Sequence, residues 1–83
     1  MSFTVVWIPA AEQNLAEIWL AAEERAAVTF AAREIDSLLK RDPDALGDAR
    51  FDSIRSFEFP PIGVDFEVLS QDRLVYVLSA WSL

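Results

Sequence analysis

The first quarter of the chain carries two hydrophobic patterns, one with strand spacing and one with helix spacing. β-Branched and aromatic residues fill positions 3–8, and apolar side chains fall on both parities, so this run predicts a strand buried on both faces. Pro9 suits the first turn of a helix, where no backbone N–H is needed. Apolar residues at i, i+4, i+7, i+8 and i+11 then predict that helix: Ala11, Leu15, Ile18, Trp19 and Ala22.

A second apolar stripe with helical spacing follows, through Val28, Ala31, Ala32, Ile35, Leu38 and Leu39. At about 100° per residue it lies roughly 140° out of phase with the first, so one continuous helix would bury two nearly opposite faces. A break at residues 23–25 instead lets both stripes face one sheet. The cations Lys40 and Arg41 suit the C-terminus of the second helix, and Pro43 ends it.

The second half of the chain alternates polar turns with apolar runs. Residues 42–52 are polar and indicate a loop, and three strands are predicted over 53–59, 63–69 and 73–81. In the second of these strands apolar residues alternate with acids, so one face is buried and the other is wet. The last strand is apolar on both parities, which predicts a central place in the sheet and a core position for Tyr76.

These elements predict one α+β domain over residues 1–83. The order β-α-α-β-β-β favours a helical hairpin packed on one face of a mostly antiparallel, four-stranded sheet. A chain of 83 residues is long enough to form one domain with a single hydrophobic core.

Composition removes several kinds of chemistry. The absence of Cys and His excludes disulfides, thiolate nucleophiles, Cys-based zinc sites and imidazole catalysts, and no motif indicates a metal or a cofactor. The formal charge of −7 opposes the basic face that nucleic-acid binders use, so direct nucleic-acid binding is not expected. No apolar run approaches the roughly 20 residues that span a bilayer, and the start lacks the basic residues of a signal peptide. We therefore expect a cytoplasmic protein.

Four segments share their order and spacing with one known superfamily. They are VVWIPAAEQNLAEIW at 5–19, LLKRDP at 38–43, RSFEFPPIGV at 55–64 and VYVLSAW at 75–81. Together they resemble the RelE/ParE superfamily of bacterial toxins from type II toxin–antitoxin pairs, also called plasmid-stabilisation proteins, over almost the whole chain. The resemblance implies a toxin that acts on gyrase or on the ribosome. It also implies a cognate antitoxin that neutralises it with a segment folded across a groove or added to a sheet edge.

Two departures from the family bear on activity. Ribosome-dependent members cut mRNA with basic and aromatic residues, whereas this chain has Gly63 and Asp65 about where they carry an Arg. Residues 80–83 also lack the Arg or Lys usually found there. Because Asp65 and Glu67 on an open face would repel phosphates, mRNA cleavage is disfavoured. The favoured interpretation is an antitoxin-binding module that acts on gyrase or has weak or lost toxicity.

The alternative, an mRNA endonuclease, would use three arginines as phosphate clamps: Arg55, Arg50 and Arg73. Arg55 is the strongest candidate because its strand resembles the family's Arg-bearing one. It also shares parity with Phe57 and Phe59, and the alternative to a functional role is an Arg at the sheet margin with its stem packed on Phe57. Arg73 opens a strand and can pair with neighbouring acids, a contact worth about 0–1 kcal/mol.

Large apolar residues off the stripes are candidates for partner binding. Leu20 and Phe30 lie off their helix stripes, and Trp81 lies two residues from the end of the sequence. Small domains rarely leave several such side chains uncovered without a partner. Trp7 and Trp19 fit core positions. Two alternatives stay open: the hairpin buries Leu20 and Phe30 itself, or the chain is a repurposed member that self-assembles through this apolar surface.

Overall fold

Two helices form where the hydrophobic stripes predict them, in a computed structural model that describes residues 2–83. α1 spans Pro9–Ala21 and begins with Pro9, and α2 spans Arg25–Arg41 with Lys40 and Arg41 in its last turn. Residues 22–24 are not helical and separate α1 from α2, which confirms the predicted helical hairpin.

Arg25 closes the turn between the helices. Its Nε and Nη2 donate to the carbonyl oxygens of Trp19 (3.1 Å) and Leu20 (3.0 Å) in the last turn of α1, where the Trp19 carbonyl also accepts the N–H of Ala22 (3.3 Å). The guanidinium carbon also lies 4.6 Å from the centroid of the Trp19 ring, a cation–π contact. One side chain therefore holds both the end of α1 and the Trp19 indole.

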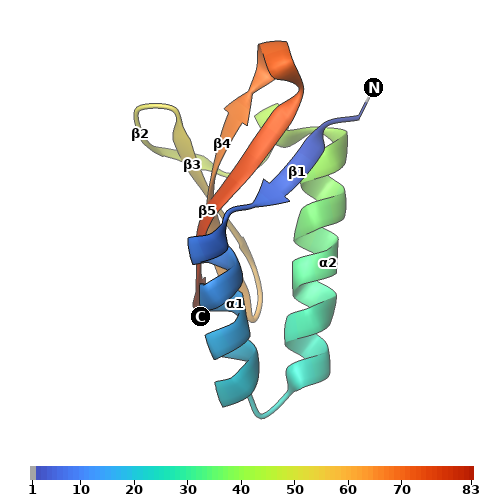
Figure 1. The fold of residues 1–83 in the computed structure, drawn as a ribbon, viewed down its shortest axis with the longest axis vertical. Helices are drawn as coiled ribbons and strands as arrows, with labels where there is room; N and C mark the ends of the chain where they lie inside the picture. The colour runs from blue at the N-terminus through green and yellow to red at the C-terminus, as the bar shows by residue number, and fades with distance from the viewer. Residues whose placement is uncertain (1) are drawn as a thin grey trace.

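The strands of residues 2–83 form one mixed sheet with the order β1-β5-β4-β3-β2 (Figure 1). Its strands are β1 Thr4–Trp7, β2 Asp48–Phe51, β3 Ile54–Phe59, β4 Ile62–Leu69 and β5 Leu74–Ser82. β1 runs parallel to β5, and the other neighbours are antiparallel. The predicted α+β fold class is confirmed, with five strands in place of four.

The additional strand, β2, corrects the prediction of a loop over 42–52. β2 is an edge strand whose four residues are all exposed, so no apolar face marks it in the sequence. Its ends are set by backbone conformation: Gly47 and Asp52 both have positive φ, at 70° and 50°. Gly47 is required by close approach as well, because an added Cβ would collide with the carbonyl of Ser56.

β1 corrects a second prediction, that of a strand buried on both faces. It is the other edge strand, and Thr4 and Val6 are exposed while Val5 and Trp7 are half-buried. The central position predicted for the last strand is confirmed, since β5 lies between β1 and β4.

The core lies between the helices and one face of the sheet. Its buried residues are Ala11, Val28, Ala31, Ile35, Leu39, Ile62, Val64, Phe66, Val75, Val77 and Ala80. A bulge leaves Leu78 of β5 without a partner in β4, so the core-facing parity of β5 changes between Val77 and Ala80. Tyr76 lies opposite Glu67, is half-buried and is outside the core, so its predicted core position is wrong.

Candidate functional site

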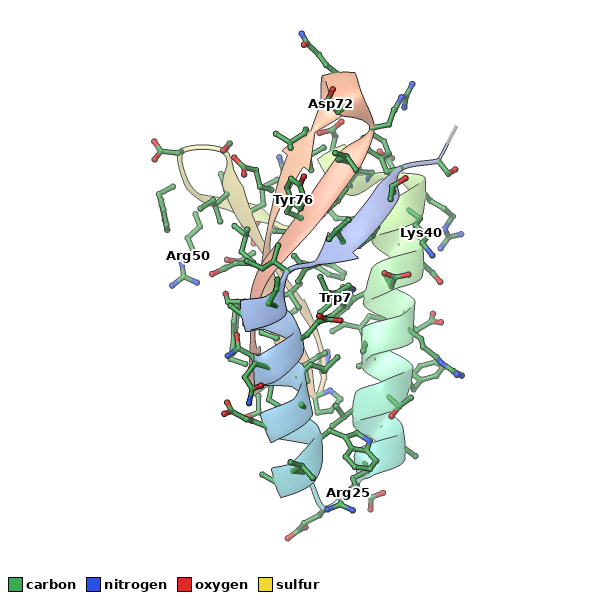
Figure 2. All side chains as sticks on the ribbon, in the orientation of Figure 1. Trp7, Arg25, Lys40, Arg50, Asp72 and Tyr76 are labelled. Carbon is green, nitrogen blue, oxygen red and sulfur yellow. The ribbon has the colours of Figure 1, made fainter. Side chains whose placement is uncertain are left out.

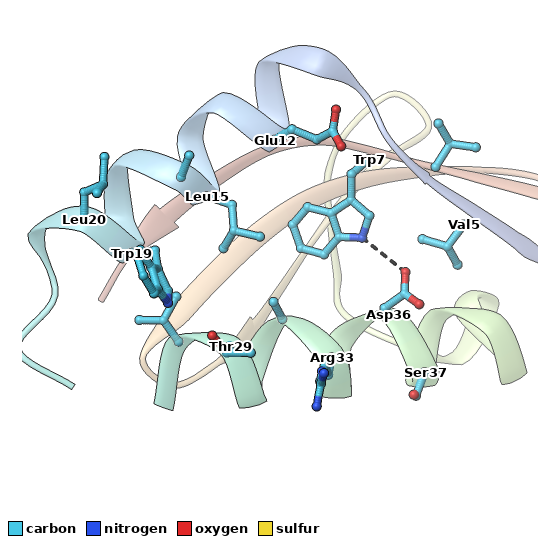
Figure 3. A pocket seen from close by; sticks show the side chains of 14 residues that line it. Val5, Trp7, Glu12, Leu15, Trp19, Leu20, Thr29, Arg33, Asp36 and Ser37 are labelled. Atoms are coloured by element: carbon cyan, nitrogen blue, oxygen red, sulfur yellow. Dashed lines mark hydrogen bonds between the residues drawn. The ribbon is translucent and has the colours of Figure 1, made fainter. Parts of the chain in front are cut away.

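A groove of about 1130 Å³ lies between α1, α2 and β1 (Figure 3). It is open to solvent along one side, so an extended segment could lie in it. We call it the interhelical groove. Its lining residues are Val5, Val6, Trp7, Glu12, Leu15, Ala16, Trp19, Leu20, Val28, Thr29, Ala32, Arg33, Asp36 and Ser37.

Large apolar side chains lie uncovered in the interhelical groove. Leu20 is 64% exposed, Trp19 39% and Val6 38%. The predicted core position of Trp19 is therefore wrong. The stripe of α1 is wider than the contact that α1 makes with the sheet, and its Trp19 side turns toward the space between the helices (Figure 3). Residues of this size are normally buried, so the groove is an apolar surface that lacks a cover.

A polar contact fixes the end of the groove nearest β1. Trp7 Nε1 donates to Asp36 Oδ1 at 3.2 Å, and Lys40 Nζ lies 3.0 Å from Asp36 Oδ2. Asp36 therefore accepts a hydrogen bond from β1 and forms an ion pair within α2, and the first of these contacts ties β1 to α2 (Figure 3). The sequence carried no signal for this contact, because Trp7 and Asp36 are 29 residues apart.

β1 also presents unpaired backbone to the groove. The N–H groups of Thr4 and Ile8 donate to the carbonyl oxygens of Arg73 (2.8 Å) and Val77 (3.1 Å), so alternate residues of β1 face β5. The intervening residues, Val5 and Trp7, direct their backbone N–H and C=O groups to the other side. No strand within residues 2–83 pairs with that side, and both residues line the interhelical groove.

The sheet face opposite the helices carries a second polar cluster, centred on Asp65. Its carboxylate accepts hydrogen bonds from Ser56 Oγ (2.5 Å), Ser79 Oγ (3.2 Å) and Arg50 Nη1 (3.2 and 3.4 Å to the two oxygens). Glu67, on the same face, accepts one from the hydroxyl of Ser53. The wet face predicted for this strand is confirmed. The centre of this face is occupied by the Asp65 carboxylate, which already accepts hydrogen bonds from Ser56, Ser79 and Arg50.

Solved structures match the fold of the chain, although no protein-family model and no curated protein matches its sequence. A chain of the toxin–antitoxin complex RelBE2 from Mycobacterium tuberculosis matches with a TM-score of 0.81 at 16% identity, over 100% of both chains. A chain of the chromosomal ParDE system of P. aeruginosa matches at 0.77 and 14% identity, over 98% of this chain and 96% of that one. An arginine mutant of the E. coli RelE toxin in the free state matches at 0.65 and 14% identity, covering 99% and 84%.

The chain has the fold of the RelE and ParE toxins. The resemblance found in the sequence is confirmed for the fold. It was based on the order of the helices and strands along the chain. At 14–16% sequence identity these matches support the fold alone. The roles of side chains in this RelE/ParE fold are therefore argued from their positions and contacts in this structure.

Within the RelE/ParE fold, the three candidate arginines do not come together. Arg50 lies on the open face at the β2 edge (Figure 2). Arg55 pairs with Phe66, a core residue, so it lies on the helix side of the sheet. There its Nε and Nη2 donate to the carbonyls of Leu46 (2.9 Å) and Gly47 (3.3 Å).

Arg73 lies at a third place, the turn before β5. It has a left-handed backbone, with φ of 54°, and its guanidinium carbon lies 5.2 Å from the centroid of the Phe3 ring. No single phosphate could contact all three arginines in this arrangement.

The three candidate partner-binding residues also lie apart. Leu20 lines the interhelical groove. Phe30 is 58% exposed and packs at 6.3 Å between ring centroids on Phe59, so the hairpin does not bury it. Trp81 lies on the open face, opposite Gly63 in β4. Of the three, Leu20 alone belongs to the groove.

Residues 2–83 contain no group of three or more carboxylates close enough to hold a metal ion. Among the same residues, neither helix has the length and apolarity that crossing a bilayer requires.

Proposed function

We propose that the chain is the toxin component of a bacterial type II toxin–antitoxin pair and that its interhelical groove holds the cognate antitoxin. The observation that carries this proposal is an uncovered apolar groove beside an unpaired strand edge, in a chain with the fold of toxins that are known in complex with antitoxins. A free toxin would expose this surface, and the antitoxin would cover it.

An extended antitoxin segment fits the groove best. It would add beside β1, exchanging main-chain hydrogen bonds with Val5 and Trp7, and it would place alternate apolar side chains against Leu15 and Trp19. Main-chain bonds supply affinity in this mode, and the groove supplies the choice of side chains.

Action on a protein target is favoured over RNA cleavage. Phosphodiester cleavage needs cations where the negative charge develops. The open face offers Arg50, whose guanidinium is already bound to Asp65, beside a second acid, Glu67. Arg55 faces the helices. We therefore propose that the chain acts by binding, with gyrase as the target that the family resemblance offers.

Growth tests this proposal directly. The chain is expressed from a tightly regulated promoter in a bacterium without the partner, with and without co-expression of the neighbouring small open reading frame. The proposal predicts growth arrest with accumulated gyrase–DNA cleavage complexes, intact transcripts, and rescue and co-purification with the neighbouring product. Cleaved transcripts would favour the endonuclease alternative, and a folded chain that fails to co-purify would overturn the proposal.

Two alanine-to-arginine variants of α1 test whether the antitoxin binds in the interhelical groove. Ala16 is exposed and lines the groove, whereas Ala10 is exposed on the same helix and does not. Ala16→Arg should abolish co-purification and rescue, and Ala10→Arg should leave both intact. Equal behaviour of the two variants would place the antitoxin elsewhere.

A further inference from the structure

Two opposite charges flank the interhelical groove. Glu12 lies on the α1 wall and Arg33 on the α2 wall, and Figure 3 shows them across the groove from one another. Both are exposed, and neither side chain has a hydrogen-bond or ion-pair partner within residues 2–83. The groove therefore separates two charges of opposite sign that do not meet.

The remaining charged residue of the lining is already compensated. Asp36 binds the Trp7 indole and the Lys40 ammonium through its two oxygens. The rest of the lining is apolar or carries neutral hydroxyl groups. Any charge preference of the groove thus depends on Glu12 and Arg33.

A segment in the groove lies between these two charges and displaces water from both. A charge that loses water without gaining a partner costs free energy, so the occupant must supply an opposite charge on each side. Charges at the rim of an interface steer association and reject partners with like charges in the same place. The walls differ in sign, so an occupant lying the opposite way would put like charges together on both sides.

We propose that the groove selects an apolar segment that presents Lys or Arg toward α1 and Asp or Glu toward α2, and that this pair fixes the direction in which the segment lies. The inference rests on the proposed function, because it specifies the chemistry of the antitoxin segment. Recognition in the groove then depends on the order of two local charges, in a chain whose formal charge is −7.

Charge reversal tests the inference. Binding of the purified product of the neighbouring open reading frame is measured at low and high salt for wild type, Glu12→Lys and Arg33→Glu. Glu17→Lys and Arg41→Glu are the matched controls, since these residues are exposed on the same helices and do not line the groove. Each groove variant should raise Kd about three- to tenfold at low salt, with a smaller effect at high salt. The controls should change Kd less than about twofold.

The double reversal, Glu12→Lys with Arg33→Glu, separates partner contacts from a contact between the two residues. If each contacts the partner, the double variant binds more weakly than either single variant. If they pair with one another instead, exchanging their signs restores affinity while cross-linking still finds the segment in its wild-type direction, and that result overturns the inference. The inference would also be overturned if the groove variants bound the product as tightly as their controls. Binding by the wild type would in that case leave the proposed function standing. No wild-type binding would refute both.

Discussion

Trp81 lies against the backbone of Gly63, and this contact gives a sharp prediction about stability. The two residues face one another across β4 and β5. A Cβ added to Gly63 would lie 2.7 Å from Cε2 of the Trp81 ring and 2.8 Å from Cζ2 and Nε1. Separations under 3.0 Å require movement, and the indole is a rigid ring. Gly63→Ala should therefore displace Trp81.

The magnitude follows from two opposing effects. Overpacking of this kind costs about 1–3 kcal/mol. The backbone of Gly63 does not have positive φ, so alanine also gains about 0.4–1 kcal/mol by restricting the unfolded chain. We expect a net loss of about 1–2 kcal/mol in the free energy of unfolding. For a domain of this size that lowers Tm by about 5–15 °C.

A double-mutant cycle measures this contact. Urea unfolding followed by circular dichroism is compared for Gly63→Ala in the wild type and in Trp81→Ala. Without the indole, the clash disappears and the entropic gain remains, so the same substitution should become neutral or stabilising by up to about 1 kcal/mol. An equal loss in both backgrounds would refute the reasoning.

Three further substitutions test other contacts. Arg55→Ala should cost about 1.5–3 kcal/mol in urea unfolding, because two loop carbonyls lose a charged donor, and it should leave growth arrest intact; lost arrest with a folded chain would restore Arg55 as a catalytic candidate. Arg25→Met should cost about 0.5–2 kcal/mol and shift the fluorescence of Trp19, since it removes both the α1 contacts and the cation–π contact; an unchanged spectrum would contradict this. Asp65→Ala should cost about 1–3 kcal/mol because three donors lose their acceptor, whereas exposed Glu58→Ala should change stability by less than about 0.5 kcal/mol; equal effects would argue against the Asp65 cluster.

The helices and the central strand were predictable because burial marks them in the sequence. The phase shift between the two apolar stripes located the break before Arg25, and the two-sided apolar run over 73–81 indicated a central strand. The edge strands were not predictable in this way. β2 buries none of its residues, and β1 is apolar on a side that the structure leaves uncovered.

The candidate sites depended on long-range geometry. The sequence shows that Arg55 shares parity with Phe57 and Phe59, but the pairing of Arg55 with the core residue Phe66 was needed to place it on the helix side of the sheet. The interhelical groove carried no local signal, since its walls come from segments brought together by the fold. Trp19 lies on the predicted stripe and is still exposed, because helical periodicity defines a face without defining what covers it.

Amide hydrogen exchange of the chain, free and bound to the product of the neighbouring open reading frame, tests the central claim most directly. The amides of Val5 and Trp7 point to the unpaired edge of β1, so they should exchange rapidly in the free chain and at least about tenfold more slowly in the complex. Amides on the β2 edge should not change. Unchanged exchange at Val5 and Trp7, with new protection confined to β2, would contradict the account.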